Sequence, residues 1–566
     1  MKNKKLKQIF VIVLGSAIIM TSLQLIQNIN AEENTLENNN FVILDENGIP
    51  TTIDSTVKNS YSVKTYQRSR SIFSNDAMAV SSDYSIVRFK PVSNATYKYT
   101  EMDSGRTGYF NPNSAMDAAY IKTDGNFTIC KMAGVKIKIS NSYIDSIVPY
   151  QDTTNISYYS TDNGNLIHTF SYYNGSEITV ASNRVGYQQS YMSNGQKYYS
   201  YDGHYFYKTF ENMIDDYQSD SHSRAINANN PYYNYFQYLS MRTTSRYSGT
   251  QYNDYVKKVK SNAESAMKTT GNDFVNSQNN YYINSVIAFG VAINESGWGT
   301  SNYALTRNNL FGIKAYDSNP DLAKTFSSTQ ECINQWMYYY MQQKYLNSWH
   351  SNYYGPHLGD KQSGANVMYA SDPYWGEKAA ARSYYMDSKK SDYGRYTIGV
   401  SNSGLTTLYK EPNTSKYLYD TSIYGQSNDA LYNYPVIILD TITSNGIKWY
   451  KVRSDMPLIS DRNGLNITDT YETNRDYAYV KASTINIVFS GNGDISDGLA
   501  ITLGDVNGDG AINAKDLLKI EKYIIDKNKN PLGTNEFKAA DINNDGQVNS
   551  KDALKVERYI VYGTKI

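Results

Sequence analysis

Ile283-Asn-Ser-Val-Ile-Ala-Phe-Gly-Val-Ala-Ile-Asn-Glu295-Ser-Gly-Trp-Gly-Thr-Ser301 is the stretch that decides the fold of the central part of this chain of 566 residues. Apolar or small residues recur in it at helical spacing, at Ile283, Val286, Ile287, Gly290 and Val291. This pattern predicts a buried helix over Tyr282–Asn294. Two glycines then end the helix and open one wall of a cleft. Glu295 lies at the helix end, where apolar surroundings favour the protonated carboxyl group that a general acid needs.

The position of Glu295 alone favours a helix-capping or ion-paired glutamate over a catalytic one. Three motifs change this balance: Asn294-Glu-Ser-Gly-Trp-Gly-Thr-Ser301, Asn308-Asn-Leu-Phe-Gly-Ile-Lys-Ala-Tyr-Asp317 and Tyr369-Ala-Ser-Asp-Pro-Tyr-Trp-Gly-Glu-Lys378. Together they resemble the bacterial peptidoglycan glucosaminidase family, a mannosyl-glycoprotein endo-beta-N-acetylglucosaminidase-like domain of the glycoside hydrolase family 73 type. The resemblance covers roughly Asn272 to Asp387. It implies a lysozyme-like α fold and endo-β-N-acetylglucosaminidase activity.

The resemblance implies catalytic roles for two carboxylates. Glu295 matches the family's catalytic glutamate and is expected to protonate the oxygen that leaves the GlcNAc anomeric carbon. Asp317 is the first choice for activating water, with Asp321 and Glu331 as alternatives and Glu377 as a structural carboxylate. A large separation between the two catalytic carboxylates would imply inversion at the anomeric carbon. The 2-acetamido group of the substrate could instead assist, which would make a second carboxylate dispensable.

Four aromatic residues in or beside the same motifs are candidates for binding saccharide rings. Tyr369 and Tyr374 are expected to line the subsites, and Trp298 and Trp375 to stack on sugar rings. A place in the protein core explains each of these aromatic residues equally well.

A second informative pattern occurs twice near the C-terminus, as Asp505-Val-Asn-Gly-Asp-Gly-Ala-Ile-Asn-Ala-Lys-Asp516 and as Asp541-Ile-Asn-Asn-Asp-Gly-Gln-Val-Asn-Ser-Lys-Asp552. Each copy has oxygen-bearing side chains at the ligand positions of a calcium loop, with glycine at the sharp turn. Each copy also runs into a helix of nearly the same sequence. The predicted ligands are Asp505, Asn507, Asp509, the carbonyl of Ala511, Asn513 and Asp516, and Asp541, Asn543, Asp545, the carbonyl of Gln547, Asn549 and Asp552.

This duplicated loop–helix unit resembles the type I dockerin domain. The resemblance implies that two Ca²⁺ ions fold the domain and that its partner is the cohesin module of a scaffolding protein. The family's recognition positions fall on Ala514-Lys515 and Ser550-Lys551, and the likeness of the two pairs allows two opposite binding orientations. Two solvated acidic turns without an ion are the alternative.

The N-terminus predicts secretion. Four lysines within the first seven residues precede an apolar run from Ile9 to about Leu25, and Ala31 is a small residue placed for cleavage. This pattern predicts a signal peptide, in preference to a retained membrane anchor. The mature protein is therefore expected to be extracellular, associated with a cell wall or a scaffold, and free of the membrane.

The composition excludes several other classes of protein. Lys+Arg and Asp+Glu are both 54, so no global field attracts nucleic acid. Cys130 and Cys332, the two cysteines, lie in apolar contexts and predict buried thiols rather than a disulfide scaffold or a Cys–His hydrolase. The five histidines form no H-E-x-x-H motif, which disfavours a zinc amidase.

The predicted fold class is multidomain α+β, with β-rich SH3-like modules flanking the α-helical lysozyme-like domain and a small all-α calcium-binding dockerin. An NG turn is expected to join two strands, 435–440 and 446–452. The expected parts are a signal peptide (1–31), a linker (32–82), a β-rich SH3-like wall-associated region (83–250), the glucosaminidase catalytic domain (251–390), an SH3-like module (391–489), a second linker (490–500) and the dockerin (501–566).

The function expected from these resemblances is cleavage of the GlcNAc-β-1,4-MurNAc bond in the glycan strands of peptidoglycan. A lytic transglycosylase and a glycoprotein-directed N-acetylglucosaminidase are alternatives on the same fold. An alternative from another class is a non-catalytic, glycan-binding scaffold component. The sequence leaves open whether the cell's own wall or that of a competitor is attacked.

Overall fold

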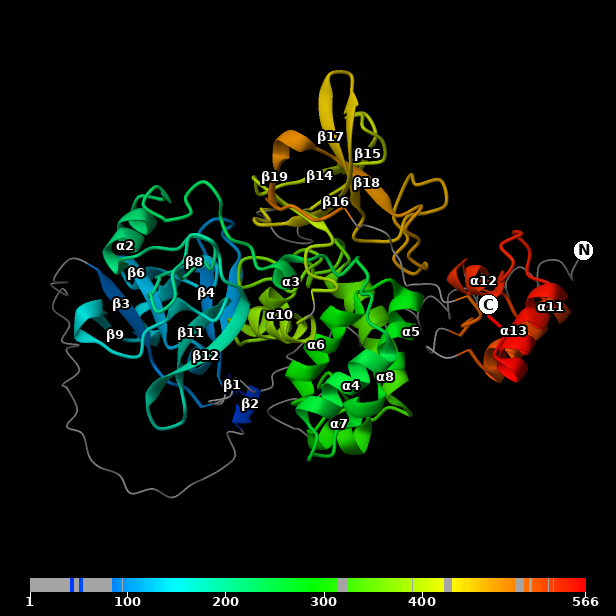
Figure 1. Cartoon of the computed structure of the whole chain (residues 1–566). Helices are drawn as coiled ribbons and strands as arrows, with labels where there is room; N and C mark the ends of the chain where they lie inside the picture. Colours follow the sequence, from blue (N-terminus) through cyan, green and yellow to red (C-terminus); the bar gives the residue numbers. More distant parts are fainter. Residues whose placement is uncertain are drawn as a thin grey trace, which may run out of the picture. The chain divides into compact units, whose positions relative to one another are not determined.

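The structure is a computed structural model (Figure 1). It describes residues 41–44, 50–53, 84–93, 95–313, 323–388, 390–421, 430–493, 503–507, 512–527, 529–532 and 534–565, without the side chains of 41–44, 50–53, 534 and 535. In this part of the chain, strands precede residue 188, helices lie between 210 and 386, strands return between 397 and 489, and helices follow from 514. This order confirms a mixed α and β protein with a β-rich N-terminal region.

The first β-rich part is an antiparallel sheet of seven described strands in the order β5-β4-β8-β7-β6-β3-β9. Strand β8 shows why these residues form strands: its valine and isoleucines are buried, while the lysines between them are half-buried. The bounds are β3 (Ser85–Phe89), β4 (Tyr97–Glu101), β5 (Thr107–Phe110), β6 (Asp117–Asp124), β7 (Phe127–Met132), β8 (Val135–Ser140) and β9 (Ile144–Pro149).

The second sheet of seven described strands repeats this topology. Its order is β15-β14-β18-β17-β16-β13-β19, so both sheets have the same strand order when each is counted from its own first strand. A short 3₁₀ turn precedes the last strand in both, at Asn141–Tyr143 and Ala482–Thr484. The bounds are β13 (Thr397–Ser401), β14 (Thr407–Tyr409), β15 (Tyr417–Asp420), β16 (Pro435–Ser444), β17 (Ile447–Arg453), β18 (Tyr477–Lys481) and β19 (Ile485–Phe489).

The hairpin between β16 and β17 confirms the predicted NG turn. Ser444 pairs with Ile447, and the two residues between them, Asn445 and Gly446, have φ angles of 51° and 76°. A two-residue turn with both φ values positive matches the twist of the flanking strands, and Asn-Gly adopts it at low cost.

The region 83–250, expected as one β-rich unit, divides into several parts. After the first sheet come three antiparallel strands, β10 (Tyr158–Asp162), β11 (Asn165–Tyr173) and β12 (Ile178–Tyr187), and then the helices α2 (Phe210–Gln218) and α3 (Tyr235–Tyr238). Phe170 and Tyr172 of β11 share one hydrophobic core with the first sheet and with Tyr374. Strand β11 therefore joins the first sheet to the helical part of the chain.

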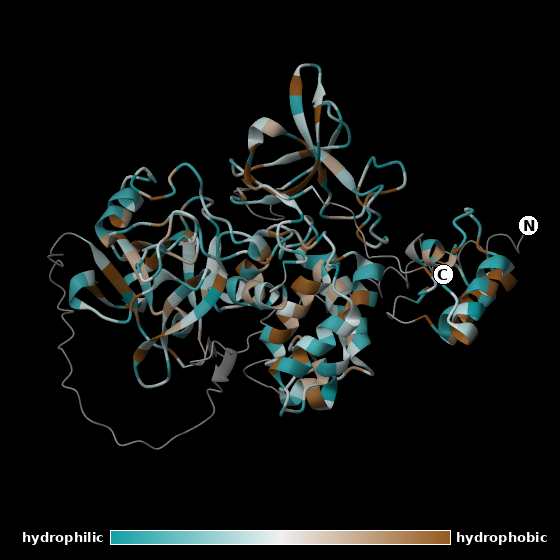
Figure 2. Ribbon diagram, viewed as in Figure 1, coloured by the Kyte–Doolittle hydropathy of each residue, from teal (hydrophilic) through white to brown (hydrophobic). Residues whose placement is uncertain are grey.

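The helical part is organised around α6 (Ser285–Ser296), in which hydrophobic residues predominate (Figure 2). Asn284 caps it by accepting hydrogen bonds from two backbone amides, so the helix begins three residues later than predicted. Around it lie α4 (Gly249–Val259), α5 (Gly271–Tyr281), α7 (Asn302–Arg307), α8 (Thr329–Gln335), a π-helix (Trp336–Tyr345), α9 (Asn366–Tyr369) and α10 (Trp375–Met386).

Helices α6 and α10 approach closely at Gly290. A Cβ atom at this position would lie 2.7 Å from the carbonyl oxygen of Ala379, so only glycine fits there without a shift. Beside it, the Ser383 hydroxyl donates a hydrogen bond to the carbonyl of Val286 (2.9 Å). This contact sets the N-terminal turn of α10 near the C-terminal turn of α6.

The C-terminal part contains the helices α11 (Ala514–Ile525), α12 (Thr534–Ala540) and α13 (Ser550–Tyr562). Asn513 and Asn549, both at loop position 9, cap α11 and α13 through matching capping boxes. The side chains of Ile520 and Val556, at equivalent positions of the two copies, are fully buried in one small core. The predicted duplication of a loop–helix unit is thus visible in the structure.

Several predicted segments lie wholly or partly outside the described residues. They are the signal peptide, most of the linker 32–82 and most of the linker 490–500. Within 32–82, however, β1 (Phe41–Leu44) and β2 (Pro50–Ile53) pair as an antiparallel hairpin where the sequence predicted no element. The apolar run Phe-Val-Ile-Leu accounts for β1, because such residues favour strands. Among the helices that the structure describes, none has the length and apolarity to cross a membrane.

Asp455 anchors the second seven-stranded sheet to the helical part. Its carboxylate accepts hydrogen bonds from the hydroxyls of Tyr353 (2.7 Å) and Tyr434 (2.9 Å). Its carbonyl accepts one from the guanidinium of Arg242, which also donates to the carbonyl of Tyr281. Burial raises the pKa of Asp455 to about 7, although the two tyrosine hydroxyls and Arg242 favour the ionised form.

The raised pKa predicts how stability depends on pH. The unfolded chain releases this proton near pH 3.8, whereas the native protein holds it until about pH 7. The free energy of unfolding should therefore fall between these two pH values, by an amount on the order of 4 kcal/mol for a fully buried group. Urea unfolding of Asp455→Asn, compared with the parent from about pH 4 to 8, should show a slope that is smaller by this contribution. An unchanged slope, or the same reduction in the exposed control Asp440→Asn, would contradict the prediction.

Candidate active site

The site is built around the C-terminal end of α6. Glu295 lies in the last turn and is only 4% exposed. Gly297, Trp298 and Gly299 follow with φ angles of 56°, 70° and 74°, and they turn the chain sharply away from the helix axis. A left-handed conformation is costly for a tryptophan. It is held here by hydrogen bonds from Ser265 to the Trp298 carbonyl (2.6 Å) and from the Gly299 amide to Ser296 (2.7 Å).

The carboxylate of Glu295 meets the first turn of α10. The indole N–H of Trp375 donates a hydrogen bond to Oε1 of Glu295 (2.5 Å), and the side-chain amide of Asn294 lies 3.3 Å from the same oxygen. Trp375 stacks on Tyr369, with ring centroids 4.3 Å apart. The hydroxyl of Tyr369 in turn accepts a hydrogen bond from the indole of Trp336 (3.1 Å). Glu295 is thus enclosed by aromatic rings and has a direct donor on one oxygen.

The surroundings of Glu295 combine two opposing influences. Aromatic walls disfavour a charged carboxylate, while an indole N–H stabilises it. Burial is the main cause that raises the pKa of Tyr369 well above its ordinary value, and the charge of Glu295 is the second. Tyr369 therefore stays neutral, and Glu295 can hold or release a proton without competition from it. This arrangement suits an acid or base that acts on a bound polar group.

Of the four aromatic residues predicted to bind saccharide, the structure brings two to Glu295. Trp375 and Tyr369 line the carboxylate and are themselves buried, 3% and 1% exposed. The ring of Trp298 packs against Tyr255 of α4 instead (5.6 Å between centroids). Tyr374 lies against Phe170 of β11 (5.3 Å). The saccharide-binding roles of all four stay predictions, and Trp298 and Tyr374 occupy packing positions.

The candidates for a second carboxylate are spread out. Asp317 and Asp321 lie outside the described residues, so their roles stay predictions. Glu331 is exposed, and its hydrogen bonds from the hydroxyl and the amide of Ser327 lower its pKa. Glu377 is buried and faces β11, away from Glu295, where it contacts His168 (2.7 Å). Its contacts agree with the structural role expected for it.

The calcium-loop residues are partly described. In the first loop Asp505, Asn507, Asn513 and Asp516 are described, and Asp509 and Ala511 are not. In the second, Asp541 accepts hydrogen bonds from the amides of Asp545 (3.0 Å) and Gly546 (2.8 Å). Asp552 accepts from the amides of Ile542 (2.9 Å) and Asn549 (3.0 Å).

These hydrogen bonds order the second loop and leave lone pairs on the carboxylate oxygens. Carboxylate, amide and carbonyl oxygens are the donors that Ca²⁺ prefers, so the residues fit this ion. Within the described residues, however, no three His, Cys, Asp or Glu side chains converge closely enough to hold a metal ion. The two calcium sites therefore stay predictions from the loop sequence.

Both cysteines behave as predicted. Cys130 and Cys332 are free and fully buried, and burial raises the pKa of each thiol. Such thiols resist ionisation and are poor nucleophiles. The structure therefore gives no support to cysteine catalysis at either position.

Comparison with protein families decides what the helical part is. Residues 271–387 match the family model described as mannosyl-glycoprotein endo-beta-N-acetylglucosaminidase, and residues 503–561 match the dockerin type I domain. The chain contains a glucosaminidase domain. It also contains a dockerin domain, a type that typically binds calcium. Helices α6 and α10, and with them Glu295, Tyr369 and Trp375, lie inside the glucosaminidase domain.

Two similar proteins, from Streptococcus pneumoniae serotype 4 (strain TIGR4) and from strain R6, carry the name "putative endo-beta-N-acetylglucosaminidase". Each is 32% identical over 230 residues. The alignments cover 40% of this chain and 29% and 27% of the two relatives, so the chain spans less than a third of their length. The 230 aligned residues exceed the length of the glucosaminidase domain itself.

Among solved structures, a catalytic mutant of Staphylococcus aureus autolysin E in complex with the disaccharide NAG-NAM is 18% identical. It covers 27% of this chain and 73% of its own, with a TM-score of 0.22. A TM-score this low does not relate the folds of the two whole chains. The domain assignment therefore rests on the family models and the streptococcal relatives.

Proposed function

We propose that the protein is a secreted endo-β-N-acetylglucosaminidase that hydrolyses the GlcNAc-β-1,4-MurNAc bond of peptidoglycan. The observation that carries the proposal is the carboxyl group of Glu295, held at the end of a buried helix and hydrogen-bonded to Trp375 inside a glucosaminidase domain. In the proposed reaction Glu295 protonates the oxygen of the leaving sugar while water attacks the anomeric carbon. The leaving sugar gains the proton of Glu295, and the anomeric carbon gains the hydroxyl group of the water. The remaining proton of the water passes to a base and finally restores the protonated Glu295.

Two sources of help for the attacking water are proposed. The first is Asp317, which would act as general base. The second is the 2-acetamido group of the GlcNAc unit, which would attack the anomeric carbon from within the substrate before water opens the resulting ring. Only the first of these two routes requires a carboxylate at position 317.

Asp317→Asn separates them. If Asp317 activates water, we expect kcat for peptidoglycan cleavage to fall by about 10²-fold or more, because general-base catalysis typically contributes 10²–10⁴-fold. Initial rates of reducing-end release give this number, and Asp254→Asn, which changes an exposed aspartate of α4, is the matched control. Full activity in Asp317→Asn would rule out its role and favour the acetamido group.

The dockerin domain is proposed to attach the enzyme to a cohesin module, with Ca²⁺ in both loops as a structural ion. Exposed apolar residues support a docking surface: Leu518 and Leu554 are 48% and 45% exposed, and Ile524 and Ile560 are 41% and 37% exposed. Each pair occupies equivalent positions of the two copies. The neighbouring recognition positions, Ala514-Lys515 and Ser550-Lys551, are exposed as well. This repetition supports two alternative binding orientations.

The two seven-stranded sheets are proposed to be SH3-like modules that bind cell-wall polymer. Their common strand order and the 3₁₀ turn before the last strand support this interpretation. Binding modules on the same chain would raise the concentration of the enzyme at an insoluble substrate. The signal peptide over residues 1–31 is proposed to deliver the protein to this extracellular location.

Digestion of purified peptidoglycan by the full chain tests the proposed function. The products are reduced and identified by mass spectrometry. New reducing-end GlcNAc supports a glucosaminidase, whereas anhydro-MurNAc would establish a lytic transglycosylase. Release of glycans from glycoproteins but not from peptidoglycan would move the assignment to the glycoprotein-directed alternative. Binding without any product would leave a non-catalytic scaffold component.

A further inference from the structure

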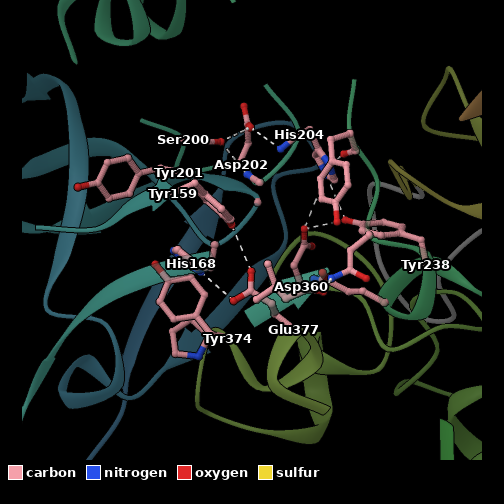
Figure 3. Close-up of a pocket in the computed structure, with 18 residues that line it drawn as sticks. Tyr159, His168, Ser200, Tyr201, Asp202, His204, Tyr238, Asp360, Tyr374 and Glu377 are labelled. Carbon is pink, nitrogen blue, oxygen red and sulfur yellow. Dashed lines mark hydrogen bonds and ion pairs between the residues drawn. The ribbon is translucent and has the colours of Figure 1, made fainter. Parts of the chain in front are cut away.

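The first turn of α10 makes polar contacts on two sides. On one side Trp375 donates its indole N–H to the catalytic candidate Glu295. Two residues later, the carboxylate of Glu377 points toward Tyr159 and His168 of the three-stranded sheet (Figure 3). Its Oε1 contacts Nδ1 of His168 (2.7 Å), and its Oε2 accepts a hydrogen bond from the hydroxyl of Tyr159 (3.2 Å). One helical turn thus connects β10 and β11 to the carboxylate of Glu295.

The partners of Glu377 are themselves fixed. The rings of Tyr159 and His168 are stacked, 4.2 Å apart and inclined by only 4°. The ring of Tyr374 meets the edge of His168 (4.9 Å). Tyr159 and His168 are 4% and 2% exposed. The His168 ring therefore has little freedom to turn away from Glu377.

A cavity of about 30 Å³ adjoins this contact, lined by Tyr159, His168, Tyr374, Glu377 and other residues of the same interface. This volume exceeds the roughly 10–15 Å³ that one water molecule needs. Because of this cavity, packing by itself would allow the Glu377 side chain to move. The contacts with His168 and Tyr159 hold the side chain in place. Losing the His168 contact would allow the turn of α10 to shift.

From this geometry we propose that His168 and Glu377 are positioning residues that hold Trp375 against Glu295. The inference rests on the proposed role of Glu295 as general acid. His168 Nδ1 donates to the Glu377 carboxylate, which fixes the turn of α10 that carries Trp375. The indole N–H then stabilises the ionised form of Glu295. Strand β11, about a hundred residues before the glucosaminidase domain, thereby lowers the pKa of its acid candidate.

The indole N–H resonance of Trp375 reports this contact directly, without substrate. Trp375→Phe identifies its signal among those of the five tryptophans in a ¹H–¹⁵N spectrum of the full chain. The signal should move with pH as Glu295 titrates and should stop moving in Glu295→Gln. Tyr369, the other titratable group described against Glu295, has its pKa raised by burial and does not interfere.

In His168→Ala we expect the midpoint of this titration to move upward by about one pH unit, because the displaced indole no longer favours the carboxylate. His168→Asn, whose amide N–H can replace Nδ1–H, should restore most of the parent midpoint. Glu377→Gln should shift the midpoint in the same direction as His168→Ala. The control His222→Ala alters a ring that stacks on Tyr205 and should leave the midpoint unchanged.

Activity measurements add a second readout. His168→Ala should lower kcat for peptidoglycan several-fold with little change in KM, and His168→Asn should recover it. An unchanged midpoint in folded His168→Ala and Glu377→Gln would overturn the inference. A shifted midpoint in a protein that does not cleave peptidoglycan would support the coupling and refute the proposed function instead. Failure of the inference and failure of the proposed function therefore give different results.

Discussion

Glu295→Gln should reduce the rate of peptidoglycan hydrolysis by about 10³-fold, the middle of the range for removing a general acid. Glutamine has nearly the same shape, and its carbonyl oxygen can still accept the hydrogen bond from Trp375. It has no acidic proton for the leaving oxygen. The rate is measured as reducing ends released from insoluble peptidoglycan by the full chain. Binding to the polymer should be unchanged, because the substitution removes the acidic proton and keeps nearly the same side-chain shape.

Glu264→Gln is the matched control for this experiment. Glu264 lies in the predicted catalytic region 251–390 but is exposed, and no catalytic role is expected for it. Its substitution should leave the rate within about two-fold of the parent, as expected for a surface change. Equal activity of Glu295→Gln and the parent would remove Glu295 from the mechanism. Unfolding curves of both variants show whether a loss of rate reflects loss of structure.

Removal of calcium should abolish capture of the protein by a cohesin module. Asp541 and Asp552 are 6% and 0% exposed, and no Lys or Arg of the described chain forms an ion pair with either. Holding such carboxylates buried without a cation is costly, so a bound Ca²⁺ ion would supply free energy of folding. Chelator should therefore weaken cohesin binding by several orders of magnitude. Excess Ca²⁺ should restore it, and hydrolysis of soluble glycan fragments should continue in both conditions.

Single substitutions refine the calcium prediction. Asp541→Asn removes a charged ligand from the second loop and should raise the Ca²⁺ concentration needed for half-maximal cohesin capture, measured by titration on a cohesin surface. Asp526→Asn, which changes an aspartate at the end of α11 outside both loops, is the matched control. Undiminished capture in the presence of chelator would show that the loops act without an ion.

Much of the fold could be predicted because its determinants are local. The buried helix α6 follows from apolar spacing, and the glycines after Glu295 adopt the left-handed conformation that ends it. The turn at Asn445-Gly446 follows from two adjacent residues. The duplicated C-terminal unit is visible in the sequence as two similar stretches. In each case the residues that decide the structure are neighbours along the chain.

Other features of the fold depend on contacts between segments or on local backbone conformation, and these could not be predicted. The predicted likeness of both β-rich parts to SH3-like modules did not specify their strand order, because strand order depends on which edges pair and not on alternation within a strand. The sequence predicts that Trp298, three residues after Glu295, stacks on a sugar ring. The left-handed backbone after α6 instead turns its ring toward Tyr255.

By itself the sequence determined the glucosaminidase and dockerin domains, the identity of the acid candidate Glu295 and the calcium-loop pattern, since motif and periodicity are properties of short segments. Only the tertiary structure decided what surrounds that acid. Trp375 reaches Glu295 across 80 positions of sequence, and His168 reaches Glu377 across 209. Contacts over such distances depend on how α10 packs, on one face against α6 at Gly290 and on the other against β11. That packing is a property of the whole fold, because no short segment contains both partners.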